Sequence, residues 1–96
     1  MGLRYNIFMS ERELEKIFKA LANRRRIAVL KFIKKSGRAS VGEIADAIKL
    51  SFTATSKHLA ILSNAGILDK EQESLTVFYF LAQEQHVVVS KLLSII

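Results

Sequence analysis

Residues 40–68 have the sequence SVGEIADAIKLSFTATSKHLAILSNAGIL, which predicts two short helices joined by a tight turn. The first helix begins with a capping box, because Ser40 stands three residues before Glu43. A turn at residues 49–50 then leads into the second helix, residues 52–65. This order is typical of a helix-turn-helix motif, in which the second helix enters a DNA groove.

The two sides of the second helix differ in chemistry. Thr55, Leu59 and Leu62 recur at helical spacing and form the side that should pack on the core. The opposite side carries small, polar or cationic residues, namely Thr53, Ser56, Lys57 and Ala60. Such groups can reach base edges and phosphates, although a solvated helix face gives the same pattern.

The rest of the chain predicts a single domain, residues 1–96, that is mainly α with a small β-hairpin. Residues 10–21 and the segment between Asn23 and Gly37 have helical patterns with capping residues at their starts. Strands are expected at residues 67–71 and 75–81, with a turn near 72–74, and a last helix at 83–96. The predicted fold is a winged helix-turn-helix of about five helices and a two-stranded wing.

The charge of the chain favours a polyanionic partner. The net charge is +6 and the isoelectric point is near 9.9. Between Lys16 and Lys57 there are eleven basic and two acidic residues, a local net charge of +9. Basic balance alone does not separate DNA from RNA, acidic lipid or acidic protein.

Several classes of function find no support in the composition. With 0 cysteines there is no disulfide, thiolate metal site or thiol nucleophile. No Gly-rich phosphate loop, nucleophile with an adjacent base, or close carboxylate pair indicates an enzyme or a cofactor. No apolar run approaches the roughly 20 residues that span a bilayer. We therefore expect a cytoplasmic, non-catalytic protein without a cofactor or a membrane partner.

Four segments of the chain are similar to the motifs of a known protein family. LANRRRIAVLKFI, from Leu21, is similar to the family's LADPTRLRILxLL, and SVGEIADAIKLS resembles SVxELAxxLxLS. SFTATSKHLAILSNAGIL is similar to SQSTVSxHLxxLxxAGLV, and VFYFL, from Val77, to VYYxL. Together these motifs cover roughly Phe18 to Leu81, and by them the chain resembles the ArsR family of winged-helix transcriptional repressors.

The resemblance implies a homodimer that binds an inverted-repeat operator in double-stranded DNA and releases it when a metal or another signal binds. Its dimer interface would come from the first and last helices, residues 10–21 and 83–96. The sequence independently shows an apolar surplus on both helices, which needs a second surface to cover it. An organic effector between these helices of the dimer is a further expectation.

Three departures from the family pattern bear on function. The Gln that commonly follows the capping serine is Phe52 here, which removes a hydrogen-bonding group but leaves an apolar contact to a thymine methyl open. The wing segment 69–74 has three acids and one base, which disfavours phosphate contact. The family's Cys-x-Cys metal box is occupied by Ser40, Val41 and Gly42, and its last-helix ligand pattern is reduced to Glu84 and His86. Neither metal site of the family is expected.

Further residues around the motif are candidates for contacts with DNA. Ser40 and Ser51 stand at helix N-termini, where free N–H groups attract phosphate, although capping alone explains both. His58 could hydrogen-bond a phosphate or titrate near neutral pH, and a partly packed helix residue that holds the turn is the alternative. The candidate basic residues beside the motif are Arg38 and Lys49. Lys34 and Lys35, with Arg38, could form a rim that binds phosphates. Arg24, Arg25 and Arg26 could contact the DNA backbone or pair with Glu11, Glu13 and Glu15.

The sequence therefore predicts a sequence-specific, dimeric DNA-binding transcriptional repressor with residues 52–65 in the major groove. Its candidate DNA-binding residues are Arg38, Ser40, Lys49, Ser51, Phe52, Thr53, Ser56, Lys57 and His58. The rival hypothesis is a winged-helix module that binds another protein. Phe52 and the acidic wing favour that rival, since an exposed Phe is a good protein anchor.

Overall fold

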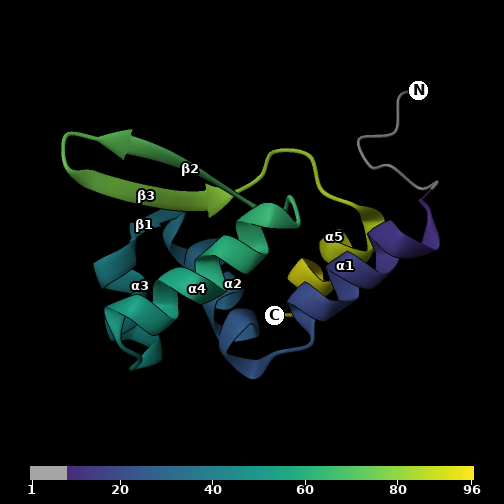
Figure 1. The fold of residues 1–96 in the computed structure, drawn as a ribbon, viewed down its shortest axis with the longest axis horizontal. Coiled ribbons are helices and arrows are strands. Elements are labelled where there is room, and N and C mark those ends of the chain that lie inside the picture. The colour runs from purple at the N-terminus through teal and green to yellow at the C-terminus, as the bar shows by residue number, and fades with distance from the viewer. Residues whose placement is uncertain (1–8) are drawn as a thin grey trace.

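The computed structural model describes residues 9–96, which form five helices and one three-stranded antiparallel sheet (Figure 1). In chain order the elements are α1 Glu11–Leu21, α2 Arg24–Ser36, β1 Arg38–Ser40, α3 Val41–Ile48, α4 Phe52–Asn64, β2 Leu68–Glu73, β3 Thr76–Leu81 and α5 Val87–Ile95. Helices α3 and α4 are the predicted helix-turn-helix, and strands β2 and β3 are the predicted hairpin. The arrangement is that of a winged helix-turn-helix.

The predicted caps set the ends of the helices. Side-chain oxygens of Ser10, Asn23, Ser40 and Ser51 accept backbone N–H groups in the first turns of α1, α2, α3 and α4. Gly37 follows α2 with φ 85°, a left-handed conformation that a residue without Cβ adopts easily. Lys49 takes a left-handed conformation at the end of α3, with φ 56°, and this reverses the chain toward α4.

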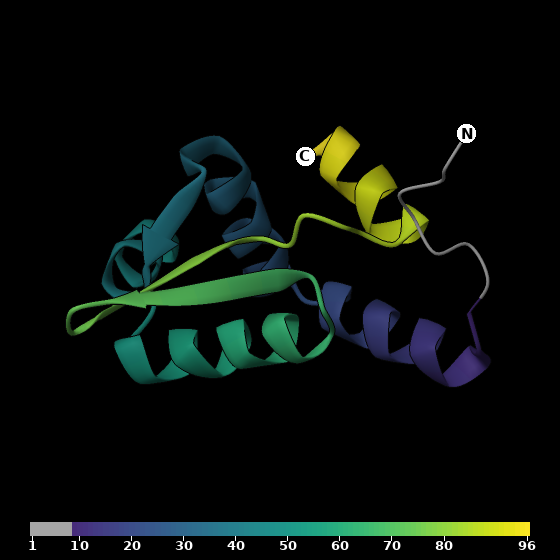
Figure 2. The same ribbon diagram turned by 90° about the horizontal axis from the view of Figure 1, so that it is seen from above.

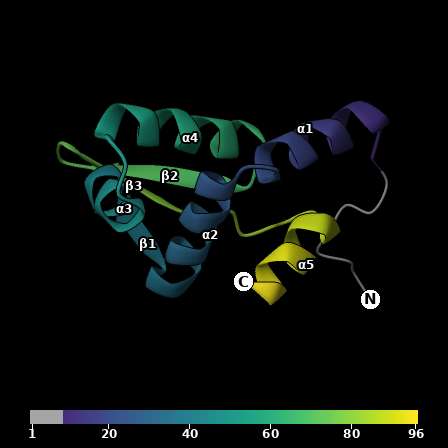
Figure 3. The same ribbon diagram turned by 90° about the horizontal axis from the view of Figure 1, so that it is seen from below.

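Helix α2 lies at the centre of the core. It packs against the other four helices and against β1 and β3, which surround it in Figure 3. Val29, Leu30 and Ile33 of α2 are fully buried. Burying each such side chain stabilises the fold by about 1.5–3 kcal/mol, so α2 fixes the positions of the elements around it.

The sheet has one strand more than the two that the sequence predicts. Its order is β1-β3-β2, and β1 pairs with β3 so that Ala39 lies opposite Tyr79. The hairpin turns at residues 74–75, at the end of the predicted turn and at the first residue of the predicted second strand, with Glu73 opposite Thr76. A strand of three residues has no alternation long enough to be read from the sequence.

The last helix begins later than predicted, at Val87 instead of residue 83. The preceding residues are held to the start of the hairpin: the Ala82 N–H donates to the Ile67 carbonyl at 3.0 Å. The buried side-chain amide of Gln85 donates to the carbonyls of Ile67 and Ala82, both at 2.9 Å. These bonds hold residues 82–85 in a non-helical connection with a bend at 83–84, so the expectation of a helix there is wrong.

The molecule has two distinct ends. Helices α1 and α5 lie at one end, and the hairpin tip and the start of α4 lie at the other, in both Figure 1 and Figure 2. Apolar side chains are exposed at the first end, with Phe18 of α1 at 53% and Ile95 of α5 at 79%. The surface that the sequence assigns to DNA is therefore well separated from the surface that it assigns to a partner subunit.

Candidate nucleic-acid interface

Helix α4 has the two-sided character that its sequence predicts. Thr55, Leu59 and Leu62 are fully buried, while Thr53 and Lys57 are exposed on the other side. Ala60 is also exposed and Ser56 is half-buried. The 13 residues of α4 include no acid, so no carboxylate on this helix would oppose a phosphate. The exposed side is small, polar and cationic, and its backbone can approach a partner closely.

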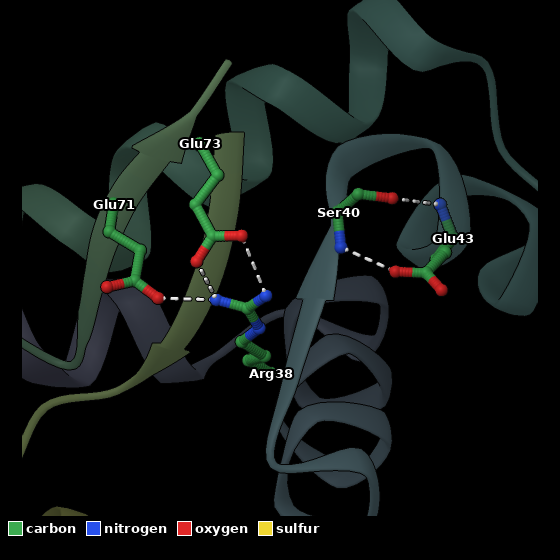
Figure 4. A network of polar contacts seen from close by, with 5 residues as sticks. All are labelled: Arg38, Ser40, Glu43, Glu71 and Glu73. Atoms are coloured by element: carbon green, nitrogen blue, oxygen red, sulfur yellow. Dashed lines mark hydrogen bonds and ion pairs between the residues drawn. The ribbon is translucent and has the colours of Figure 1, made fainter. Parts of the chain in front are cut away.

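The N-termini of α3 and α4 differ in their attraction for an anion. At α3 the Glu43 carboxylate accepts the Ser40 N–H at 2.8 Å, while Ser40 Oγ accepts the Glu43 N–H at 3.1 Å (Figure 4). The bonds from Ser40 lower the pKa of Glu43 below its usual value, so its negative charge is retained. At α4, Ser51 Oγ accepts the Ala54 N–H at 3.1 Å and no acid lies in the first turn. Ser51 therefore has the better site for a phosphate.

Arg38 binds the wing. Its Nη1 donates to Glu71 at 2.6 Å and to Glu73 at 2.8 Å, and its Nη2 donates to Glu73 at 3.1 Å (Figure 4). The guanidinium carbon also lies 4.0 Å from the centroid of the Phe78 ring. Arg38 thus reaches from β1 over β3 to β2, and the predicted phosphate contact of Arg38 stays a prediction.

The same contacts change the charge balance of the wing. The hydrogen bonds and the positive charge of Arg38 lower the pKa of Glu73. Two of the three wing acids are paired with Arg38, and only Asp69 has no ion pair among the bridges of the described residues. The hairpin is consequently less repulsive to a polyanion than its sequence suggests.

His58 is held by a residue that the sequence did not link to it. Arg26 Nη1 lies 3.2 Å from His58 Nδ1, and a guanidinium has only donors, so Nδ1 accepts. Burial lowers the pKa of His58, and the charges of Arg26 and Arg25 lower it further. The imidazole is therefore neutral at pH 7 with its proton on Nε2. This disfavours titration near neutral pH, whereas the phosphate contact of His58 is untested.

Arg25 and Arg26 each bind the C-terminal end of a helix. Arg26 donates to the carbonyls of Lys19 and Ala20 at 2.9 and 2.6 Å, and Arg25 donates to the carbonyl of Ile48 at 3.3 Å. The sequence offered ion pairs between these arginines and the acids of α1 as one alternative. Among the described residues neither arginine forms such a pair. Cations are favourable next to helix C-termini, so a cluster of arginines is a signal for such contacts. The sequence alone does not show that the ends of α1 and α3 lie near the start of α2.

The remaining candidates fall on two sides of α3. Lys49 is exposed and borders a hollow of about 460 Å³ together with Arg24, Arg25 and Ile48. Phe52 is 62% exposed and borders a different hollow, at the starts of α3 and α4. Lys34 donates to the Leu93 carbonyl of α5 at 2.6 Å, and its phosphate role, like that of Lys35, stays a prediction. Within the helix-turn-helix, residues 41–64, the basic residues are Lys49 and Lys57, and both are exposed.

The metal sites of the family do not fit this chain. Ser40, Val41 and Gly42 offer no thiolate at the start of α3, and Ser40 is engaged in the capping box. Within residues 9–96, no group of three or more His, Cys, Asp and Glu side chains is placed to hold a metal ion. His86 Nδ1 is buried without a hydrogen-bond partner, but no group of metal-ligating side chains within residues 9–96 includes it.

A comparison with known sequences identifies the family. Residues 23–70 match the profile described as bacterial regulatory protein, arsR family. The chain belongs to this family. It is 36% identical to the transcriptional activator HlyU of Vibrio cholerae over 80% of its length and 77% of that protein. It is also 30% identical to the arsenical resistance operon repressor of Bacillus subtilis, over 77% of the chain and 70% of the relative.

The fold is also similar to that of a solved structure. The homodimeric winged helix-turn-helix DNA-binding domain Mb0332 of Mycobacterium bovis superimposes with a TM-score of 0.75 at 28% identity, covering 91% of this chain and 82% of that one. The predictions of a winged helix-turn-helix and of a regulatory protein that is not an enzyme are confirmed by the family. No helix within residues 9–96 of this ArsR-family chain is long and apolar enough to cross a bilayer.

Proposed function

We propose that this ArsR-family regulator is a transcriptional repressor that binds an inverted-repeat operator in double-stranded DNA as a homodimer. The observation that carries the proposal is the exposed face of α4, where Thr53 and Lys57 lie on a capped helix that has no acidic residue. N-terminal residues of such a helix reach base edges in the major groove. Thr53, Ser56 and Lys57 are the proposed contacts of this face.

Phosphate contacts would supply much of the affinity. The +9 local charge of residues 16–57 favours binding that weakens steeply as salt is added. We assign phosphate contacts to Ser51, Lys49 and the Nε2–H group of His58. Ser40 is a weaker candidate because Glu43 already faces the start of α3, and Arg38 is weaker because two carboxylates hold it.

The proposed dimer joins the ends formed by α1 and α5. Phe18 and Ile95 are exposed there, and Val88, Leu92 and Leu93 are only partly buried within one chain. A twofold axis at this end would set two α4 helices about 34 Å apart, on successive turns of the major groove. The solved relative Mb0332 is described as homodimeric, which supports the same assembly here. An organic effector between α1 and α5 stays a prediction.

Repression needs only that the bound dimer obstruct the transcription machinery. The named relatives include one activator and one repressor, so family membership alone does not decide the outcome. A reporter gene whose promoter contains the selected operator would test it. We expect lower expression when the protein is present, and higher expression would contradict repression while leaving DNA binding intact.

The decisive binding experiment compares the double variant T53A/K57A with the wild type on operator DNA. Both residues are exposed, so the variant should fold normally and lose at least tenfold in affinity. Lys31→Ala removes one exposed charge from α2 and is the matched control, for which we expect little change. Unchanged affinity in a folded T53A/K57A protein would remove α4 as the reading helix.

A second candidate function is a protein-interaction module. It is favoured by two exposed apolar residues close to α4, Phe52 at 62% and Leu75 at 95%. Binding to random DNA fragments at two salt concentrations separates the candidates. Binding that weakens with salt supports the repressor, and absence of binding even at low salt favours the protein module.

A further inference from the structure

Phe52 is an exposed aromatic residue on a rigid support. It is the first residue of α4, and its side chain is 62% exposed. Thr55, Leu59 and Leu62 are the residues of this helix that pack in the core. Ser51 caps the turn that carries it, with Oγ accepting the Ala54 N–H at 3.1 Å. The backbone position from which the ring projects is therefore set by the cap.

The ring borders a small hollow with apolar walls, which we call the apolar notch. Val41, Phe52, Leu75 and Val77 line it, together with Ser40, Gly42 and Thr76, and its volume is about 240 Å³. Leu75, in the turn of the hairpin, is 95% exposed. The notch thus joins the start of α4, the proposed reading helix, to the tip of the wing.

The notch is continuous with the proposed DNA-binding face of α4. Thr53 is the next residue along the helix, and Lys57 follows one turn later on the exposed side. Contacts by the first residues of a helix in the major groove are made to base edges. A partner that covers Thr53 and Lys57 would therefore also meet Phe52.

The chemistry of the major groove leaves Phe52 one counterpart. Guanine, cytosine and adenine present hydrogen-bonding groups there and no methyl group, whereas thymine adds an apolar C5 methyl group. A phenyl ring has no hydrogen-bond donor or acceptor, so it cannot bond the polar base edges. Its contact with the thymine methyl removes apolar surface of both groups from water, which is favourable. We propose that Phe52 makes the operator specific for thymine, with the apolar notch removing the methyl group from water. This inference rests on the proposed function and adds to it the base that is read.

The test changes one methyl group on the DNA. An operator is selected from random fragments with the wild-type protein, and each thymine is then replaced in turn by deoxyuridine, which lacks only the methyl. At one position of each half-site we expect about a fourfold loss of affinity per methyl, the factor that corresponds to burying one such group. Equal affinity for thymine and deoxyuridine at every position would overturn the inference.

Two variants assign the effect to Phe52. Phe52→Ala should bind the thymine and deoxyuridine operators equally at that position, and Phe52→Leu, which keeps an apolar side chain, should retain part of the preference. Urea unfolding of each variant checks that the fold is intact. If Phe52→Ala keeps the full preference for thymine, another residue reads the methyl and the inference fails while DNA binding stands. If the wild type binds no DNA at low salt, the proposed function fails first.

Discussion

Arg26 donates from Nη1 to His58 Nδ1 over 3.2 Å, and the same guanidinium binds the carbonyls of Lys19 and Ala20. One side chain near the start of α2 therefore joins the end of α1 to the middle of α4. Since α1 belongs to the proposed dimer interface and α4 to the proposed DNA interface, this contact connects the two functional ends of the molecule. It is a half-buried network within a single chain, so its removal has measurable consequences.

Arg26→Ala should destabilise the fold. The variant leaves the carbonyls of Lys19 and Ala20 without their charged donor, and we expect the free energy of unfolding to fall by about 1–3 kcal/mol. Urea denaturation followed by circular dichroism measures this. Arg24→Ala, from the exposed side of the same helical turn, is the control and should change stability by less than about 0.5 kcal/mol. Equal effects of the two variants would refute the capping role of Arg26.

The lowered pKa of His58 makes stability depend on pH. The unfolded histidine titrates near 6.5, and the folded one titrates lower because burial and Arg26 disfavour its charge. The folded state thus binds the proton less readily, so stability is full above about pH 6.5 and is lost as the pH falls toward the folded pKa. Unfolding measured at about pH 7.5 and about pH 5.5 should show a smaller loss in His58→Gln than in the wild type. Parallel losses in both proteins would show that other groups cause the dependence.

Thr55→Val should stabilise the protein. Thr55 is fully buried in α4, and its Oγ1 has no hydrogen-bond partner. Valine has nearly the same shape and carries no polar group, so the cost of burying the hydroxyl, about 1–2 kcal/mol, is removed. A higher midpoint of thermal unfolding is the expected result. A lower midpoint would mean that the hydroxyl has a partner in solution, such as an ordered water.

Arg38 and Lys57 should differ in the salt dependence of DNA binding. Arg38 is held by Glu71 and Glu73, so Arg38→Ala should leave the slope of log affinity against log salt unchanged. Lys57 is exposed, and Lys57→Ala should reduce that slope by about 1 if it contacts a phosphate. A comparable reduction for Arg38→Ala would show that the wing carboxylates release the guanidinium when DNA binds.

The local features of this fold could be predicted from its sequence because they depend on neighbouring residues. Ser40 and Glu43 form a capping box by virtue of their spacing alone, and Ser51 and Gly37 set helix ends in the same way. The buried face of α4 follows from the spacing of Thr55, Leu59 and Leu62. The two strands of the wing likewise followed from local sequence, at residues 67–71 and 75–81.

The contacts between distant residues could not be predicted. Arg38 and Glu73 are 35 positions apart, and their pairing depends on β1 joining the hairpin as a third strand. The expected last helix begins late because the side-chain amide of Gln85 donates to the carbonyl of Ile67, 18 positions away. Arg26 and His58 are separated by 32 positions. In each case the tertiary arrangement had to be known before the side chain could be given a partner.

The acids of β2 have a consequence for the way in which chains associate. Strand β2 is an edge of the sheet, and its residues after Leu68 are exposed along Asp69–Glu73. An unpaired edge strand can template the addition of a strand from another molecule, and charged side chains on it prevent such growth. The other edge, β1, is only three residues long. The charges that suit this wing poorly to phosphate therefore protect the sheet from aggregation and leave the apolar ends of α1 and α5 as the surface through which copies of the chain would meet.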